Sequence, residues 1–541
     1  ATPHTAEVAR RRTFAIISHP DAGKTTLTEK LLLFSGAIHV AGSVKARKAS
    51  RHATSDWMEI EKQRGISVAS SVMQMLYREH VINLLDTPGH RDFSEDTYRV
   101  LTAVDSALMV IDAANGVEAQ TKRLIEVCRQ RDTPIMTFVN KMDREGRDPI
   151  ELLDEIEAEL GMPCVPMTWP VGQGKAFGGI INLRTQTMRV FQPGEDTVEA
   201  SAAEEIPLSD TATLKARFGA DFDHAMANIE LLSGVSPAFD REAFLAARQT
   251  PVFFGSAVNN FGVQEVLDAL VDLAPPPHPR ASSNADGSLT EIAPDSEGFS
   301  GVVFKVQANM DPQHRDRIAF VRVCSGKYAS GMKLKVVRSG KEMRPTSVVT
   351  FLSQRREAVD EAYAGDIIGF TIHGGVQLGD TITDGASLQF TGLPFFAPEL
   401  FQTVELKNPL KSKQLQQGLA QLGEEGAIQV FKPQLGSLML LGAVGQLQFE
   451  VVQHRLSTEY KAEIALKGSQ FVGARWVTCD DPAEMKKFMD YNAAKLAYDA
   501  ADTLAYLLTS NYDLRLTQER HPKIQFHPLR EHAGLKLEQA A

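Results

Sequence analysis

The prediction of the fold starts from the stretch Ser18-His19-Pro20-Asp21-Ala22-Gly23-Lys24-Thr25. An apolar run the size of one strand (residues 14–17) precedes it, and a helical pattern (residues 25–34) follows it. This order and spacing are typical of a phosphate-binding loop, although Ser18 stands where the motif has its first glycine. In such a loop backbone N–H groups point at phosphate oxygens from a helix N-terminus. We therefore predict a nucleotide site in which Lys24 reaches the β- and γ-phosphates and the Thr25 hydroxyl binds Mg²⁺.

Three further motifs stand directly after predicted strands: Asp86-Thr87-Pro88-Gly89-His90, Asn140-Lys141-Met142-Asp143 and Gly255-Ser256-Ala257. The first motif places a carboxylate in the metal shell and a glycine amide beside the γ-phosphate. The aspartate of the second can accept hydrogen bonds from both N1–H and the 2-amino group of guanine, a donor pair that adenine lacks. Backbone N–H groups of the third can reach the guanine O6. The four motifs together predict a site for GTP or GDP with Mg²⁺.

His90 is the predicted catalytic residue. An isolated histidine is usually structural, but one placed immediately after Asp-x-x-Gly can orient or polarise the water that attacks the γ-phosphate. We expect slow intrinsic hydrolysis, because no arginine within the motifs is positioned to stabilise the transition state. The predicted nucleotide contacts are Ser18, His19, Pro20, Asp21, Ala22, Gly23, Lys24, Thr25, Asp86, Thr87, Pro88, Gly89, His90, Asn140, Lys141, Met142, Asp143, Ser256 and Ala257.

Periodicity and composition divide the 541 residues into three units and a linker. Residues 1–275 predict a doubly wound, mainly parallel α/β GTPase domain, with glycine-rich and acidic segments at about 161–248 that we interpret as an insertion. The proline-rich and polar stretch 276–297 predicts a linker. Short β-branched runs over 298–392 predict a small antiparallel β-barrel, and 393–541 a C-terminal α/β domain. The fold class is therefore multidomain α/β.

The charge distribution bears on the kind of partner. The formal net charge of −11 taken alone argues against a nucleic-acid partner. Residues 195–297 carry 18 acidic and five basic side chains, whereas 298–400 carry ten and 12. Basic residues gather in the barrel near the single acid Glu342, where contact with ribosomal RNA and an ordinary surface both remain open. They are Lys327, Lys333, Lys335, Arg338, Lys341 and Arg344.

Neither a membrane segment nor a disulfide framework is expected. No apolar run approaches the roughly 18 residues that a transmembrane helix needs. The four cysteines lie too far apart in the sequence for a disulfide scaffold or a paired metal site. These observations favour a cytoplasmic protein, which we expect to be a monomer.

At its motifs the chain resembles the translational GTPases, and more closely the bacterial class II peptide chain release factors. The phrases that carry the closer resemblance are SHPDAGKTTLTEK (18–30), ATSDWMEIEKQRGIS (53–67), residues 71–74 and Trp476-Val477. The resemblance implies a GTP-driven factor that binds the ribosome after peptide release and promotes departure of the class I release factor. It also implies that Pro20 and Ile66 form an apolar gate beside His90.

The resemblance adds Ser67 to the site. GTPases of this kind place a switch hydroxyl on Mg²⁺ after the sequence Arg-Gly-Ile, and relatives commonly have threonine where this chain has Ser67. Serine keeps the metal-binding oxygen and loses a methyl group, so a ligand role and an ordinary loop serine are both considered. The predicted metal ligands are Thr25, Ser67 and Asp86.

Three other functions are considered. An elongation factor G-like factor would share the first domain, but only about 150 residues follow the barrel here, too few for the additional domains of that factor. A metabolic GTPase subunit would share the motifs and a barrel, but not the 53–67 phrase. The departures from the usual motifs at Ser18 and Ser67 would suggest a GTP-binding scaffold without hydrolysis, yet both side chains carry a hydroxyl oxygen.

Overall fold

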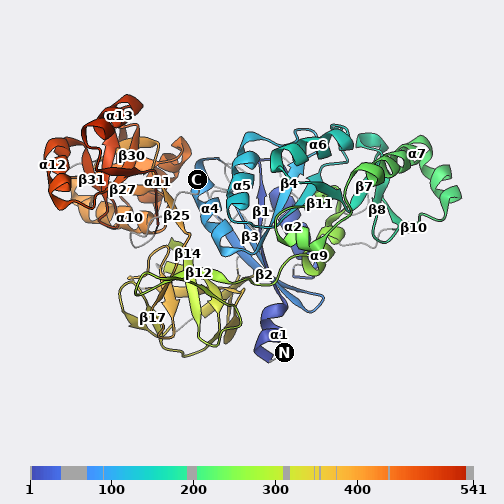
Figure 1. Cartoon of the computed structure of the whole chain (residues 1–541), viewed down its shortest axis with the longest axis horizontal. Helices are drawn as coiled ribbons and strands as arrows, with labels where there is room; N and C mark the ends of the chain where they lie inside the picture. The colour runs from blue at the N-terminus through green and yellow to red at the C-terminus, as the bar shows by residue number, and fades with distance from the viewer. Residues whose placement is uncertain are drawn as a thin grey trace.

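The computed structural model describes residues 3–37, 70–88, 91–191, 204–308, 317–345, 348–352, 355–372, 375–436 and 439–531. Three units are visible in Figure 1, with the GTPase domain in the centre and the C-terminal domain at one end of the long axis. The β-barrel lies below the gap between them in this view. Among the residues described, no helix has the length and apolar character needed to cross a lipid bilayer.

The GTPase domain is built on a seven-stranded sheet with the order β2-β3-β1-β4-β5-β11-β6. All neighbouring strands run parallel except β2, which forms an antiparallel pair with β3. Side chains alternate between the two faces of β1, so that Ala15 and Ile17 face one core and Phe14 and Ile16 the other. Helices α4, α5 and α6 cover the first face, and α2 and α9 cover the second.

β1 contains the apolar run predicted as a strand (residues 14–17), and α2 contains the predicted helix (residues 25–34). The strands are β1 (Arg11–Ser18), β2 (Ser71–Tyr77), β3 (His80–Asp86), β4 (Ser106–Asp112), β5 (Ile135–Asn140), β6 (Cys164–Pro166) and β11 (Thr250–Phe254). The helices are α1 (Pro3–Ala9), α2 (Lys24–Phe34), α4 (Ser94–Ala103), α5 (Ala119–Gln130), α6 (Pro149–Leu160) and α9 (Val263–Asp272), with short 3₁₀ turns η1 (Arg91–Phe93) and η3 (Ala257–Asn259).

The segment predicted as an insertion contains one strand of the main sheet. β6 pairs in parallel with β11, with Cys164 opposite Thr250, and all three of its residues are buried. The chain beyond β6 forms a separate antiparallel sheet of order β10-β9-β8-β7 with two helices. Its elements are β7 (Thr168–Val171), η2 (Gly174–Ala176), β8 (Gly179–Asn182), β9 (Thr187–Val190), β10 (Glu205–Pro207), α7 (Thr211–Val235) and α8 (Arg241–Leu245). Figure 1 shows α7 and β10 at the end of the molecule opposite the C-terminal domain.

The stretch predicted as a polar linker contains a β-hairpin. β12 (Arg280–Asn284) and β13 (Leu289–Ile292) are joined by a turn in which Gly287 has a φ of 82°. β12 also pairs with β24 (Leu388–Phe390), so the hairpin belongs to a three-stranded sheet. The hydroxyl of the fully buried Ser282 lies 3.1 Å from that of Thr290. The polar composition of this stretch did not indicate strands. Strands are held by hydrogen bonds between main-chain N–H and C=O groups, and these bonds do not require apolar side chains.

The β-barrel domain is an antiparallel sheet of order β18-β17-β23-β14-β15-β22-β19-β20. Its strands are β14 (Ser300–Ala308), β15 (Arg317–Ser325), β17 (Leu334–Val336), β18 (Glu342–Met343), β19 (Val348–Leu352), β20 (Arg355–Ala358), β22 (Ile367–Ile372) and β23 (Thr381–Thr383). A smaller hairpin pairs β16 (Lys327–Ala329) with β21 (Glu361–Tyr363). Ala319 and Val321 of β15 share one face with their partners Phe370 and Ile368 of β22, and all four side chains are buried in the core.

The C-terminal domain is an eight-stranded antiparallel sheet of order β29-β26-β28-β27-β31-β32-β30-β33. Helices α10 and α11 pack with β26, β28 and β29, whereas α12 and α13 pack with β30 and β32. The strands are β26 (Leu400–Leu406), β27 (Gln429–Pro433), β28 (Leu440–Ala443), β29 (Ile464–Gly468), β30 (Gly473–Thr478), β31 (Leu496–Tyr498), β32 (Leu504–Leu508) and β33 (Gln525–His527). The helices are α10 (Ser412–Glu424), α11 (Gln446–Thr458), α12 (Pro482–Asn492) and α13 (Asn511–Arg520), with 3₁₀ turns η4 (Pro409–Lys411) and η5 (Ala493–Lys495). A separate pair joins β25 (Pro394–Phe396) to β34 (Leu529–Glu531).

Candidate nucleotide site and its connections to the other domains

The phosphate-binding loop connects β1 to α2 at the carboxyl edge of the main sheet. Ser18 is the last residue of β1, and Lys24 is the first of α2. Gly23 precedes the helix with a φ of 96°, and a Cβ atom there would lie 2.3 Å from Nδ2 of Asn140. Glycine is therefore required here for two reasons, the left-handed backbone and the close approach of a second motif.

Lys24 and Asp86 are brought together across the sheet edge. The Lys24 ammonium contacts the Asp86 carboxylate, and only 6% and 3% of the two side chains are exposed. Asp86 is the last residue of β3, which lies beside β1. Thr87 donates a hydrogen bond of 2.6 Å to the carbonyl of Ile16, which fixes the start of the second motif against β1. Thr25 follows Lys24 in the first turn of α2.

Asn140 joins three of the four motifs. Its Nδ2 donates to the carbonyl of Ala22 in the phosphate-binding loop at 2.9 Å. Its Oδ1 accepts from the backbone N–H of Ala257 in the last motif, also at 2.9 Å. The amide is buried, so both bonds are protected from competition by water. Asn140 therefore holds the phosphate side and the base side of the site in a fixed relation.

Asp143 is positioned by the last motif. Ser256 Oγ donates to Asp143 Oδ1 at 2.6 Å, and Asn259 Nδ2 donates to Ser256 Oγ at 2.8 Å. The backbone N–H of Met142 donates to the carbonyl of Gly255 at 3.1 Å. One carboxylate oxygen of Asp143 is thus held by a hydroxyl, which fixes the orientation of the carboxylate.

Lys141 has a structural role that the motif alone does not reveal. Its backbone has a φ of 70°, and its ammonium lies 2.7 Å from Asp112 Oδ2 and contacts the carbonyl of Asp21. Burial by itself raises the pKa of Asp112, but hydrogen bonds from Lys141 and the Ala114 amide lower it below its ordinary value. Asp112 therefore stays ionised and holds the Lys141 ammonium, which also contacts the phosphate-binding loop at Asp21.

Two carboxylates near the loop were not singled out from the sequence. Asp112 is the last residue of β4. Its position at a strand end, like that of the other motifs, is the feature of the sequence that could have identified it as part of the site. Glu118 precedes α5, and its Oε2 lies 2.7 Å from Nε2 of His19. The other ring nitrogen of His19 lies 2.6 Å from the carbonyl of Pro20. No local pattern relates Glu118 to His19, because 99 residues separate them in the sequence.

Among the predicted site residues, Ser67, Gly89 and His90 lie outside the described residues, as does the phrase 53–67 that contains Ile66. The chain on either side of them is described. Ser70 donates its N–H to Asp96 Oδ2 at 2.7 Å, and its hydroxyl lies 3.0 Å from the ammonium of Lys305 in the barrel. Pro88 accepts a hydrogen bond from Thr97 in α4 at 3.2 Å.

Asp92, two residues after the second motif, contacts the C-terminal domain. Its Oδ2 accepts from the backbone N–H of Leu447 at 2.7 Å, at the first turn of α11. A Cβ atom on Gly445 would lie 2.0 Å from the Asp92 side chain, so only glycine allows this approach. An acidic group at a helix N-terminus is favourable because it satisfies a free N–H and interacts with the helix dipole.

Helix α4 continues this contact. Glu95 accepts a hydrogen bond from Gln429 Nε2 at 3.1 Å, and Arg99 donates to the carbonyl of Gly426 at 3.4 Å. Burial raises the pKa of Glu95 above its ordinary value in spite of the neighbouring Arg99. Tyr98 packs on Phe396, with ring centroids 4.9 Å apart. Helix α4 thus contacts the third domain directly after the second nucleotide motif.

The fold and the site together define a GTP-binding domain of the translational GTPase class. The family description "Elongation factor Tu GTP binding domain" matches residues 9–276, and "Elongation factor G domain 2" matches 298–385. A crystal structure of a protein from Thermus thermophilus has a TM-score of 0.68 at 24% identity, covering 88% of this chain and 71% of that one. That likeness supports the arrangement of the fold.

The C-terminal domain and the full-length relatives specify the family. "Class II release factor RF3, C-terminal domain" matches residues 390–518. The chain is 67% identical over 529 residues to peptide chain release factor 3 of Bordetella pertussis, covering 98% of each chain. It is 66% identical over 536 residues to peptide chain release factor 3 of Nitrosomonas eutropha, covering 99% of each. The chain belongs to the peptide chain release factor 3 family and is a GTPase of translation termination.

Proposed function

We propose that this chain is a ribosome-dependent GTPase that promotes dissociation of class I release factors after peptide release. Family membership supports the termination step. The hydrogen bond from Leu447 to Asp92 supports a coupling between GTP hydrolysis and movement of the C-terminal domain. It links the chain just after the second nucleotide motif to that domain. A change at that motif can therefore alter how the C-terminal domain docks.

The predicted residues suit GTP and Mg²⁺ in their chemistry. The Thr25 hydroxyl and the Asp86 carboxylate are oxygen donors, which Mg²⁺ prefers, and Ser67 would supply a third. Bound Mg²⁺ would neutralise charge on the phosphates. Lys24 is the cation available to the β- and γ-phosphates, and it now pairs with Asp86. Asp143, oriented by Ser256, would read the guanine edge.

The role that we propose for His90 is to orient the attacking water. The residue follows Asp86-Thr87-Pro88-Gly89, and the described contacts on either side anchor this segment at Thr87 and at Asp92. Pro20 and Ile66 would form the gate through which His90 moves. Ribosome contact would then set the rate of turnover, which agrees with slow hydrolysis by the free protein.

The same connections suggest how the barrel responds. The Lys305 ammonium contacts both the carbonyl and the hydroxyl of Ser70, the first described residue after the segment that holds Ser67. The two motif-flanking segments are thus each tied to a different domain, one to the barrel and one to the C-terminal domain. We propose that nucleotide state changes the two contacts together.

The domain boundaries, the binding partners and the cellular compartment are also part of this proposal. We retain a GTPase domain over 1–275, a connecting stretch over 276–297, a barrel over 298–392 and a C-terminal domain over 393–541. Ribosomal RNA and ribosomal proteins are the proposed partners, and the cytoplasm is the proposed compartment of a monomeric factor. The barrel cations support an RNA contact only in part, because Lys333 pairs with Glu342 at 2.6 Å and Arg338 with Asp380 at 2.7 Å.

The decisive experiment measures GTP turnover and release-factor departure together. Ribosomes halted at a stop codon and holding a fluorescent class I release factor are mixed with the full chain and GTP. The proposal expects faster turnover than without ribosomes, and faster dissociation of the labelled factor. Stimulated turnover with an unchanged dissociation rate would assign the protein to another ribosomal step, such as an elongation-like one.

A further inference from the structure

The edge strand β29 of the C-terminal domain is the starting point. It pairs with β26 on one side only and ends the eight-stranded sheet. The N–H of Lys407 donates to the carbonyl of Glu463. The main-chain groups of Glu463, the residue just before β29, therefore point toward the β26 side of the sheet. In an antiparallel ladder, residues whose main-chain groups bond to the neighbouring strand alternate with residues whose main-chain groups point away from it. Ile464, opposite Leu406, is the next residue after Glu463 and belongs to the second kind. Main-chain groups of Ile464, Leu466 and Gly468 therefore point away from the sheet.

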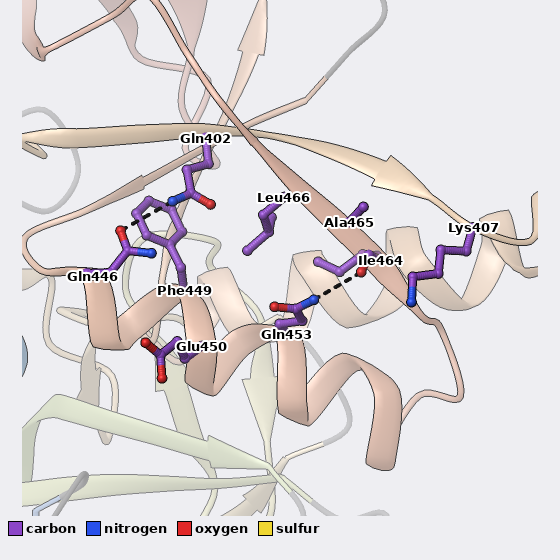
Figure 2. Close-up of a pocket in the computed structure, with 9 residues that line it drawn as sticks. All are labelled: Gln402, Lys407, Gln446, Phe449, Glu450, Gln453, Ile464, Ala465 and Leu466. Carbon is purple, nitrogen blue, oxygen red and sulfur yellow. Dashed lines mark hydrogen bonds between the residues drawn. The ribbon is translucent and has the colours of Figure 1, made fainter.

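A groove lies along this outward edge. It has a volume of about 390 Å³ and is bounded by β29 on one side and by α11 on the other. Figure 2 shows Leu466 projecting between the two, with Gln402 and Gln446 at one end and Lys407 at the other. Phe449 and Leu466 contribute apolar surface, so the groove combines a hydrogen-bonding edge with an apolar wall.

A glutamine already imitates part of a strand partner. Gln453 on α11 donates from Nε2 to the carbonyl of Ile464 at 3.1 Å, as drawn in Figure 2. A side-chain amide here takes the position that the N–H of a neighbouring strand would occupy. At the other end Gln402 donates to Gln446 at 3.3 Å. Amide side chains of this kind can exchange their bonds for bonds to a peptide main chain.

The charges favour a polypeptide rather than a nucleic acid. The lining has one cation, Lys407, and one anion, Glu450, whereas a phosphate backbone is held by clustered cations. Lysines on an edge strand usually discourage strand addition. Lys467, the lysine of β29, is paired with Glu405 of the neighbouring strand at 2.5 Å, so its charge is balanced within the sheet.

We propose that an extended segment of a protein partner adds to β29 as a further strand, in the groove between β29 and α11. This mode of binding draws affinity from main-chain hydrogen bonds and selectivity from alternate side chains. The five residues of β29 span about 16 Å, which matches a segment of about five residues. Gln446 lines the groove and begins α11, and the next residue, Leu447, bonds to Asp92. A segment bound in the groove would therefore lie next to the contact between Leu447 and Asp92, which connects this domain to the chain after the second nucleotide motif.

The test rests on the proposed function, since ribosomes halted at a stop codon with a class I release factor serve as the partner. Hydrogen exchange at Leu466 and Gly468 is compared for the full chain alone and in that complex. The proposal expects at least tenfold slower exchange at both amides in the complex. A photoreactive benzophenone amino acid in place of Gln453 is expected to cross-link to a polypeptide.

A matched pair of variants separates strand addition from loss of fold. A Cβ atom at Gly468 would meet nothing within 4 Å, and its N–H points outward. Gly468→Pro therefore removes an outward donor and leaves the ladder to β26 intact, whereas Gly468→Ala keeps the donor. We expect about tenfold weaker binding to the complex for Gly468→Pro, and binding within twofold of the unsubstituted chain for Gly468→Ala.

Four results would overturn the inference: unprotected amides in a complex that does stimulate GTP turnover, equal binding by the two variants, cross-links to ribosomal RNA, or protection that grows with protein concentration without ribosomes. The last would indicate pairing between two copies of this chain. Turnover is measured in the same samples. If ribosomes do not stimulate it, the proposed function fails, and this inference fails with it.

Discussion

At the scale of single residues, the nucleotide site depends on side chains that hold other side chains. Asn140 bonds to both Ala22 and Ala257, and Ser256 orients Asp143. A change at one of these positions should therefore affect either nucleotide choice or the chemical step, according to which contact it removes.

Asp143→Asn tests the reading of the base. In the proposal the carboxylate accepts from two donors on guanine, and an amide in its place would present a donor of its own, so the affinity for GDP should fall by about 100-fold and that for xanthosine diphosphate should rise. Fluorescence titration with both nucleotides measures the change. Asp148→Asn is the control, because Asp148 caps the start of α6 and asparagine caps equally well. An unchanged preference for guanine in Asp143→Asn would refute the assignment.

His90→Ala tests the proposed catalytic residue. The role of the imidazole in the proposal is to orient water, so GTP affinity should be retained while ribosome-stimulated turnover falls by about 100-fold or more. Single-turnover hydrolysis with ribosomes measures the effect. His80→Ala, at the start of β3, should turn over GTP like the unsubstituted chain. Normal stimulated turnover by His90→Ala would remove this residue from the mechanism.

At the scale of elements, α4 and α11 form the connection between the nucleotide motif and the third domain. Asp92→Ala removes the acceptor for the N–H of Leu447. Loss of such a helix cap costs about 1 kcal/mol, so exchange at the Leu447 amide should quicken about fivefold. Hydrogen exchange with mass spectrometry measures it in the full chain.

The matched control for this prediction is Asp481→Ala. Asp481 caps α12 within the same domain by accepting from Ala483 and Glu484, far along the chain from the contact between Asp92 and Leu447. The substitution should loosen α12 and leave Leu447 unchanged. Equal exchange at Leu447 in Asp92→Ala and in the unsubstituted chain would show that the contact does not hold α11.

At the scale of the whole molecule, buried ion pairs join the barrel to the GTPase domain. Arg322 of β15 donates to Asp105 Oδ2 at 2.7 Å, and both side chains are almost completely buried. Arg11 of β1 lies 2.9 Å from Asp366 of the barrel. These pairs orient the barrel because each charge, once removed from water, requires its partner.

Arg322→Ala should lower the free energy of unfolding by about 3 kcal/mol at pH 7, because it leaves the Asp105 carboxylate buried without its main partner. Burial raises the pKa of Asp105, but Arg322, His278 and Arg280 together hold it below the ordinary value of 3.8. A carboxylate with a lowered folded-state pKa contributes stability above its unfolded pKa and loses it as pH falls. The difference from the unsubstituted chain should therefore shrink progressively below about pH 4.

Urea unfolding at pH 7, 4 and 3 measures this difference. Lys327→Ala serves as the control, because the Lys327–Glu361 pair lies on the exposed surface and should leave the unfolding free energy nearly unchanged. A constant difference from pH 7 to pH 3 would show that Asp105 is not the group responsible.

The barrel surface differs from what its local sequence suggests. Six cations stand near one acid in the sequence, Glu342, yet Lys327 pairs with Glu361 and Arg338 with Asp380. These acids lie 34 and 42 residues further along the chain and reach the cations only because strands pair across the barrel. Counting charges in a window of sequence therefore overestimated the free positive surface.

The class of fold, the GTPase motifs and their order could be predicted from the amino-acid sequence. This was possible because apolar runs of strand and helix length are local signals, and because the carboxyl ends of parallel strands meet at one edge. Tertiary structure alone decided that β6 completes the main sheet, that the polar stretch after α9 forms a hairpin, and that Asp112, Glu118 and Asp92 join the nucleotide motifs to their surroundings. Each of these depends on hydrogen bonds between segments far apart in the chain, which local propensity and spacing do not encode.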